Sequence, residues 1–276
     1  MKKKMLAYPY LIWMVIFIVV PMLLILGYSF ISAGTGGTMQ LTLQNITQCF
    51  RPEYLRIMWI SFELAGISTI LCLLIGYPLA LILSGATFKN KDALVFLLLA
   101  PMWMNFLLRT YAWLTLLERN GVINSFLKWV NLPTWNVINT PTAVMIGMIY
   151  NFLPFMVLPI YTVMSKIDGN LIEAARDLGA DKWGVFRKVI FPWSLAGVFS
   201  GIIMVFMPAV TTFVIPNLLG GAKTMMIGSL IEMQFFTADR WGFGSALSAV
   251  IMVIMILVAY FANRRGDIEE SGGGLL

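Results

Sequence analysis

The stretch EAARDLGADKWGVFRKVIFP, from Glu173 to Pro192, is a dense group of charges in a chain of the opposite character. The chain is 59% hydrophobic and 12% charged, yet nine of its 32 charged side chains (19 basic plus 13 acidic) lie within residues 166–188. A soluble domain carries about 25% charged residues, and several apolar runs here exceed the roughly 20 residues that a helix needs to cross a bilayer. These runs do not alternate in polarity as β-barrel strands do. The sequence therefore predicts an all-α polytopic membrane protein in which residues 165–192 form a loop exposed to water.

Six spans are predicted within one transmembrane domain that covers residues 1–276, at about 8–30, 60–83, 93–117, 141–164, 193–216 and 245–263. Basic residues are enriched in cytoplasmic loops. If the N-terminus is cytoplasmic, twelve Lys and Arg residues lie on the cytoplasmic side and six on the outer side. Both termini and the 165–192 loop are therefore expected in the cytoplasm. The net charge of +6 reflects this orientation effect and does not indicate a nucleic-acid partner.

Two outer segments carry patterns of their own. Residues 118–140 contain a short amphipathic pattern that predicts a helix at the membrane interface, formed around Phe126, Leu127, Trp129 and Val130. In residues 217–244, two adjacent glycines precede the apolar stretch MMIGSLIEMQFF. This segment is expected to fold back into the protein as a re-entrant element, which is tolerated where protein or water satisfies its backbone.

The charged loop is predicted to begin with a short helix over residues 168–179. Asn170 is a suitable N-cap, and Glu173, three positions later, can return a hydrogen bond to it. Gly179 can adopt a left-handed conformation and end the helix. The apolar face of this helix is formed by Leu171, Ile172, Ala175 and Leu178.

A second short helix is expected to begin at Asp181, with Trp183 on one side, and Pro192 suits the first turn of the fifth span. Two short helices in succession predict a compact element to which a partner can dock. The alternative is a solvated loop that only orients the protein in the membrane. A cap, a stop and an apolar face favour the docking element, because a plain linker needs none of them.

The loop resembles the cytoplasmic EAA loop of the permease subunits of type I ATP-binding-cassette importers. That pattern is Glu-Ala-Ala, three residues, Gly, nine residues, Ile-x-Leu-Pro, and here Val189 and Phe191 replace the isoleucine and the leucine. The residues that match in register are Glu173, Ala174, Ala175, Gly179 and Pro192. The resemblance implies the importer permease fold, and it implies that this loop, including Trp183, docks into a groove of a separate ATPase subunit.

The resemblance extends over nearly the whole chain. GYPLALIL at 76–83, APMWMNFLLRTYAW at 100–113 and NLLGGAKTMMIGSLIEMQF at 217–235 are similar to polyamine permeases of the B-subunit type, which carry spermidine and putrescine. Relatives that carry other small solutes share parts of these motifs. The resemblance implies a bacterial plasma membrane location and four kinds of partner: ATPase subunits that bind ATP, a second permease of the C type, an extracellular or periplasmic substrate-binding protein, and the polyamine itself.

Several kinds of chemistry are missing from the sequence. The chain has no histidine, the commonest general base and metal ligand, and no G-x-x-x-x-G-K-[ST] loop for phosphate. Cys49 and Cys72 are expected to be free thiols. A membrane enzyme is therefore disfavoured, and no ATPase site, metal or cofactor is expected in the chain itself. An ion-coupled secondary transporter would show an inverted repeat and mid-membrane carboxylates, which this sequence does not.

A path for a polyamine needs carboxylates to neutralise ammonium groups and aromatic faces to attract them. The candidates, several within or beside the similar motifs, are Trp103, Asn105, Tyr111, Glu118, Pro208, Thr211, Thr212, Glu232 and Asp239. For the aromatic residues the alternative is an interfacial belt or span packing, and for the acids it is a solvated loop charge. Pro208 can kink the fifth span beside the two threonines and line the path.

Glu63 and Arg109 are ionisable residues predicted inside spans. Charges at membrane depth usually pair or line a wet cavity. A helical rise of about 1.5 Å per residue places both at a similar depth near the outer leaflet. They are expected to form an ion pair or to share a hydrogen-bond network through Asn105. The alternative is that Arg109 extends alone to the interface.

Overall fold

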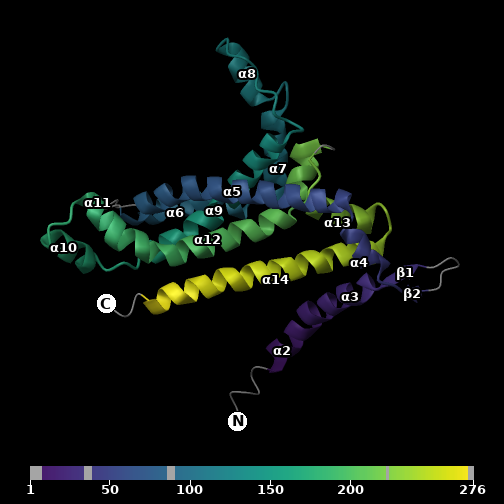
Figure 1. The fold of residues 1–276 in the computed structure, drawn as a ribbon. Helices are drawn as coiled ribbons and strands as arrows, with labels where there is room; N and C mark the ends of the chain where they lie inside the picture. The colour runs from purple at the N-terminus through teal and green to yellow at the C-terminus, as the bar shows by residue number, and fades with distance from the viewer. Residues whose placement is uncertain (1–7, 34–38, 86–90, 222–223, 273–276) are drawn as a thin grey trace.

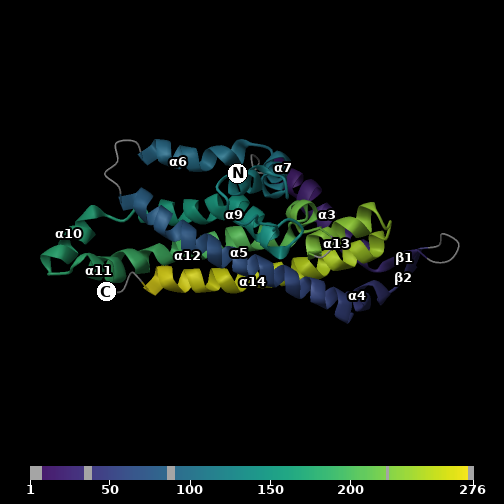
Figure 2. The same cartoon turned by 90° about the horizontal axis from the view of Figure 1, so that it is seen from above.

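The computed structural model describes residues 8–33, 39–85, 91–221 and 224–272. Its long helices lie side by side along one direction (Figures 1 and 2). The first half contains α2 (Tyr8–Met14), η1 (Val15–Val19), α3 (Val20–Ser29), β1 (Ile31–Ala33), β2 (Met39–Leu41), α4 (Gln44–Cys49), α5 (Pro52–Gly85), α6 (Lys91–Leu99), η2 (Ala100–Trp103), α7 (Phe106–Leu117) and α8 (Val122–Trp129). The second half contains α9 (Pro141–Met164), α10 (Gly169–Asp177), α11 (Lys182–Val185), η3 (Phe186–Ile190), α12 (Phe191–Thr211), η4 (Pro216–Gly220), α13 (Ile227–Phe236) and α14 (Trp241–Gly272).

The core is built by α5, α9 and α12, which pack on one another most extensively. Glycines let their backbones approach, as is common between membrane helices. A Cβ added at Gly197 of α12 would lie 2.9 Å from the Ile160 Cα of α9, and one at Gly76 of α5 would lie 3.1 Å from the Met156 Cγ of α9. Helix α14 lies along α12 and α3. These close approaches fix α9 in the middle of the bundle (Figure 2).

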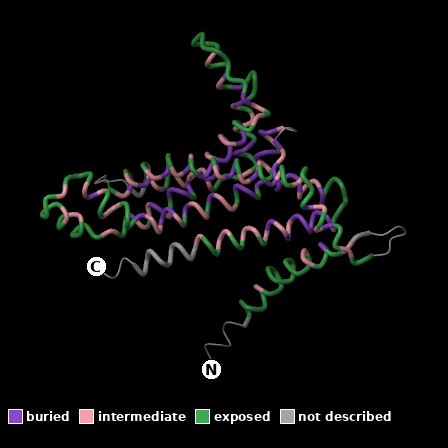
Figure 3. Tube along the Cα trace, in the orientation of Figure 1, coloured by how far each residue is buried: buried purple, intermediate pink, exposed green. Residues whose placement is uncertain are grey.

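Five helices are long and apolar enough to cross a membrane, and a sixth span is possible if one bent pair counts as a single span. Helix α9 coincides with the predicted fourth span, whereas α5 begins at Pro52, eight residues before the prediction. The first span, Pro9–Ser29, has no buried residue in its most apolar window, and its α2 end diverges from the bundle (Figures 1 and 3). The short strands pair antiparallel, with Ile31 opposite Leu41, in a hairpin that the sequence patterns did not predict.

The prediction of a continuous third span over 93–117 is wrong. Residues Ala93–Trp103 and Phe106–Trp129 are bent by 92° relative to each other. Met104 is extended (ψ 149°), and the Asn105 side chain accepts hydrogen bonds from the N–H groups of Leu107 and Leu108, so α7 begins anew. The apolar content of residues 93–117 does not reveal this break, which depends on Asn105 as an N-cap.

The helix of the fifth span is also longer than predicted at one end and shorter at the other. Residues Lys182–Thr211 form one helix of 30 residues, so the short helix expected at Asp181 runs directly into the span and ends before residue 216. The joint is a π-helical turn, η3, in which the Phe191 N–H reaches back five residues to the Phe186 carbonyl. Pro192 explains the turn, because proline has no N–H and its ring displaces the carbonyl four residues earlier. The π turn η1 precedes Pro21 in the same way.

Residues 213–221 and 224–236 fold back against the bundle. The Ile227 N–H at the start of α13 donates a hydrogen bond of 2.7 Å to the Ser61 Oγ of α5. A Cβ at Gly228 would overlap the carbonyl oxygens of Thr211 and Thr212. This fold-back agrees with the re-entrant element that the sequence predicts. The depth of the element in a membrane stays a prediction. Lys2, Lys3, Lys4, Lys89 and Lys223, which enter the orientation argument, lie outside the described residues.

Candidate functional site

The charged loop lies at one end of the bundle as α10 and α11 (Figure 1). Asp168, not Asn170, caps α10: its carboxylate accepts a hydrogen bond of 3.0 Å from the Asn170 N–H. The prediction of a capping box between Asn170 and Glu173 is therefore wrong, because the helix begins at Gly169, one residue after the acid. Glu173 is exposed to solvent and is available to another molecule.

Gly179 ends α10 as predicted, with a φ of +82°. Its N–H donates to the Arg176 carbonyl at 2.8 Å, and the Ala180 N–H donates to the Ala175 carbonyl at 3.0 Å. These two bonds form a Schellman motif, which satisfies the last carbonyls of a helix and needs a left-handed residue. The turn from α10 to α11 is consequently well defined.

The second helix begins as expected, because the Asp181 carboxylate accepts a hydrogen bond of 2.9 Å from the Gly184 N–H. Several apolar side chains of the loop face solvent: Leu178 is 89% exposed, Trp183 is 65% exposed and Leu171 is 41% exposed. Ala174 is also exposed. Apolar groups gathered at the tip of a charged element are typical of a surface that another protein covers. We call residues 168–192 the docking segment.

Aromatic rings join the docking segment to two spans. The Trp183 ring stacks on Phe186 at 5.4 Å, and Phe186 meets the Tyr77 ring of α5 edge-on at 6.3 Å. The Phe191 ring lies 6.3 Å from Tyr77 and 6.2 Å from Phe186. The Tyr77 hydroxyl also lies 3.0 Å from the Ser194 Oγ of α12. The motif GYPLALIL that holds Tyr77 does not predict this role, because Tyr77 and Ser194 are 117 residues apart in the sequence.

The substrate-path candidates fall into three places. The first is the end of α12, where Pro208 and Thr211 are exposed and Thr212 is buried as the last residue before the break. Beyond the break, the Asn217 side chain donates a hydrogen bond of 3.4 Å to the Glu232 carboxylate of α13. The structure thus brings four of the candidates to the region where α12 ends and α13 returns.

Asp239 belongs to the second place, a hollow of about 630 Å³ between the first span and the start of α14. Its carboxylate accepts a hydrogen bond of 2.7 Å from the Trp241 indole. The neighbouring Arg240 guanidinium donates to the Gln48 side chain at 3.0 Å and lies 4.9 Å from the centre of the Phe243 ring. The Asp239 carboxylate is therefore already hydrogen-bonded, and it lies beside a cation. It is less suited than Glu232 to bind an ammonium group.

The third place is the broken third span. Trp103 ends η2 and is 74% exposed, and Tyr111 on α7 is 50% exposed. Asn105 uses its side-chain oxygen to cap α7. Glu118, at the end of α7, has an exposed side chain, and its carbonyl accepts a hydrogen bond from Asn124 at 3.0 Å.

The ion pair expected between Glu63 and Arg109 is absent from the described part of the structure. Arg109 is only 8% exposed, with its guanidinium 5.8 Å from the centre of the Phe106 ring and its Nε buried without a hydrogen-bond partner. Glu63 is exposed on α5, and Asn105 bonds its own helix instead of a shared network. The depth estimate failed because it treated residues 93–117 as straight, and the bend at Asn105 turns α7 out of that line.

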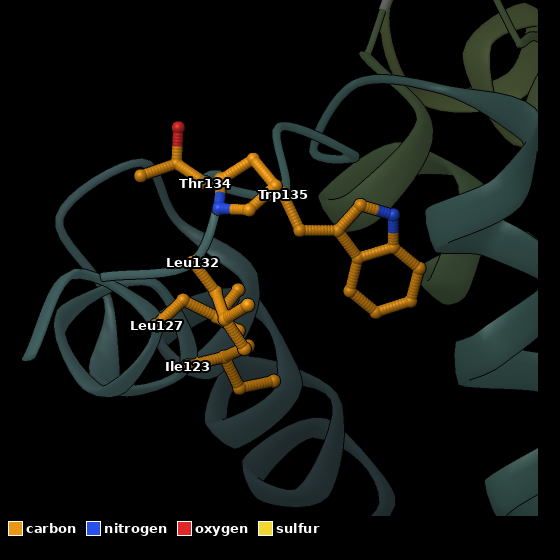
Figure 4. A pocket seen from close by; sticks show the side chains of 6 residues that line it. Ile123, Leu127, Leu132, Thr134 and Trp135 are labelled. Atoms are coloured by element: carbon orange, nitrogen blue, oxygen red, sulfur yellow. The ribbon is translucent and has the colours of Figure 1, made fainter. Parts of the chain in front are cut away.

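The amphipathic helix expected in residues 118–140 is present as α8, which projects from the bundle (Figure 1). Trp129 is 80% exposed and Phe126 is 59% exposed. The following loop turns back because the buried Asn124 side chain bonds both the N–H and the carbonyl of Trp135. An apolar hollow of about 440 Å³ lies between helix and loop (Figure 4), and it is lined by Ile123, Leu127, Leu132, Pro133, Thr134 and Trp135.

Comparison with known proteins decides the family. Residues 3–266 match the family described as "binding-protein-dependent transport system inner membrane component". The chain belongs to this family. The spermidine/putrescine transport system permease protein PotB of Haemophilus influenzae is 39% identical over 259 residues, which cover 91% of each chain. PotB of Escherichia coli is 38% identical, over 91% of this chain and 94% of the relative.

Solved structures of transport complexes share the fold. A chain of a bacterial ABC transporter involved in the import of the acidic polysaccharide alginate superposes with a TM-score of 0.80 at 19% identity, over 96% of both chains. A chain of the MetNI methionine ABC transporter gives a TM-score of 0.54 at 18% identity, over 79% of this chain and 94% of that one. The expectation of a helical importer permease is confirmed, and the short β1–β2 hairpin is a departure from the all-α prediction.

Proposed function

We propose that this family member is the membrane-spanning permease subunit of an ATP-driven importer that moves polyamines, spermidine or putrescine, into the cytoplasm. The observation that carries the proposal is the 39% identity to a PotB protein over 91% of both chains. The chain acts as one domain over 1–276. It has no ATPase site, metal or cofactor of its own, and a separate ATPase subunit binds ATP.

The docking segment is the proposed seat of that ATPase. It presents Glu173, Leu178 and Trp183 to solvent on a rigid turn. A second permease of the C type and a substrate-binding protein complete the transporter, because one chain offers one docking segment. This arrangement puts both termini and the docking segment in the cytoplasm. Glu173→Ala is expected to lower co-purification of the ATPase, and Arg119→Ala, an exposed change on the outer side, serves as its control.

Glu232 is the carboxylate that we propose meets a substrate ammonium. It is half-buried, it contacts Asn217, and it lies on α13 about one turn after Gly228, which packs against the carbonyl oxygens of Thr211 and Thr212 at the end of α12. Broken helices offer their C-terminal carbonyls to cations in other transporters. Pro208, Thr211 and Thr212 lie on the same approach.

Uptake by the complete reconstituted transporter tests this function. Proteoliposomes loaded with ATP should accumulate labelled spermidine or putrescine, and Glu232→Gln should lower uptake more than it lowers complex assembly. Asp239→Asn should have a smaller effect, because that acid is already bonded to Trp241. Glu53→Gln, in the exposed first turn of α5, is the control. Accumulation of another solute class with no polyamine uptake would favour the alternative, a permease for a different small solute.

A further inference from the structure

Two hydroxyl groups on α5 make hydrogen bonds to other elements near opposite ends of that helix. Tyr77 bonds α12 beside the docking segment, and Ser61 bonds the first residue of α13. The two residues are 16 positions apart, a separation of about 24 Å along an α-helix. One continuous helix, Pro52–Gly85, therefore joins the element that docks to the element that carries Glu232.

The direction of the bond at Tyr77 follows from its neighbour. The Ser194 hydroxyl donates to the Phe191 carbonyl at 2.8 Å, and a serine has one proton to give. The Tyr77 hydroxyl is therefore the donor to Ser194, which is fully buried. Together with the ring contacts of Tyr77 to Phe186 and Phe191, this bond holds the start of α12 against α5, directly after the π turn in the chain.

The bond at Ser61 supplies a cap that α13 lacks. Met226, the N-cap residue, makes no side-chain capping bond, and the first N–H groups of a helix have no partner within it. Ser61 accepts from the Ile227 N–H at 2.7 Å and donates its own proton to the Ile57 carbonyl at 2.8 Å. Ser61 is fully buried, so the start of α13 is held by α5 without competition from water.

We propose that Tyr77 and Ser61 are positioning residues for energy coupling, which make α5 the connection between the docking segment and the Glu232 end of the path. Movement of the docking segment displaces α5 through Tyr77, and α5 displaces α13 through Ser61. The inference rests on the proposed function, because it assumes that an ATPase moves the docking segment. It adds which span carries the motion and which two hydrogen bonds transmit it.

The test uses the complete reconstituted transporter and measures three quantities: co-purified ATPase, ATP hydrolysed and solute transported. Tyr77→Phe keeps the ring and Ser61→Ala keeps the helix, so both should retain normal amounts of co-purified ATPase. The solute transported per ATP should fall about fivefold in each, the factor by which one hydrogen bond shifts an equilibrium. Tyr161→Phe and Ser200→Ala are the controls, since Tyr161 makes no side-chain hydrogen bond among the described residues and Ser200 bonds only its own helix.

A double variant tests whether the effect comes from the bond between Tyr77 and Ser194. Tyr77→Phe with Ser194→Ala should be no worse than Ser194→Ala alone, because Ser194→Ala already removes the bond from Tyr77 together with the bond that Ser194 donates to the Phe191 carbonyl. Unchanged transport per ATP in both single variants would overturn the inference and leave the proposed function intact. ATP hydrolysis and transport that fall in parallel would also overturn the inference, because they would indicate a purely structural role for the two hydroxyl groups. Failure of the unaltered chain to retain an ATPase would instead refute the proposed function.

Discussion

The left-handed conformation of Gly179 determines the turn between α10 and α11 in the docking segment. A Cβ there would meet no atom within 4 Å, so the constraint comes only from its φ of +82°. Gly179→Val should cost the local turn about 1–2 kcal/mol, because an L-residue with a branched side chain avoids that region. We expect loss of ATPase co-purification while the protein still inserts in the membrane. Gly179→Asn should be tolerated better, since asparagine visits this region.

The control for this experiment is Gly169→Ala, at the start of α10, where an added Cβ also meets no atom within 4 Å and φ is not positive. Co-purification and uptake that survive in Gly179→Val would show that the turn is not needed for docking.

Cys49 gives a second test at the residue scale. Burial raises the pKa of this thiol from 9.0 to about 11, against a smaller lowering by its own backbone hydrogen bond. Because burial disfavours the charged thiolate, the reactive form stays scarce until the pH approaches 11. In a Cys72→Ser background, maleimide labelling of the folded protein should remain slow at pH 9, where an ordinary thiol is half ionised. Labelling in SDS gives the unfolded reference, and equal rates at pH 9 would contradict the burial.

At the scale of the element, the break before α7 depends on the Asn105 cap. Asn105→Ala removes the acceptor for two N–H groups and should destabilise the protein by about 1 kcal/mol. Asn105→Asp keeps an oxygen acceptor and should recover the stability that Asn105→Ala loses. Thermal melting of the purified protein in detergent measures both, with the exposed Asn136→Ala as control. If the Asp and Ala variants melt alike, the cap does not hold this break.

Features that depend on nearby residues were predictable from the sequence, whereas features that depend on contacts between distant residues were not. The roles of Gly179 and Asp181 were predicted correctly because turns and caps depend on neighbours a few residues away. The 92° bend, in contrast, was missed because length and apolar content do not reveal direction. The bond between Tyr77 and Ser194 could not be foreseen, since it forms only after α5 and α12 pack. The pairing of Glu63 with Arg109 failed because it depended on the direction of α7.

For the whole molecule, the fold predicts which surfaces face each side of the membrane. The docking segment lies at one end of the bundle, and α14 runs toward that end from the region of the β1–β2 hairpin (Figure 1). With both native cysteines replaced, Leu178→Cys should react with a membrane-impermeant thiol reagent only from the cytoplasmic side. Trp129→Cys on α8 should react from the outer side. Both side chains are highly exposed, so labelling of both from the same side would refute the orientation.

The π turn at η3 has a consequence for how this helix tolerates insertion and deletion. A π turn holds one residue more than the α-helical path needs. Because the extra residue is accommodated within the turn, the segments on its two sides keep the phase of a regular helix. Deleting one residue from the regular helix that follows, between Ser194 and Pro208, would instead rotate the docking segment by about 100° relative to the rest of the span. Phe186 and Trp183 would then turn away from the Tyr77 ring of α5. The π turn thus keeps the docking segment in phase with the span that follows it.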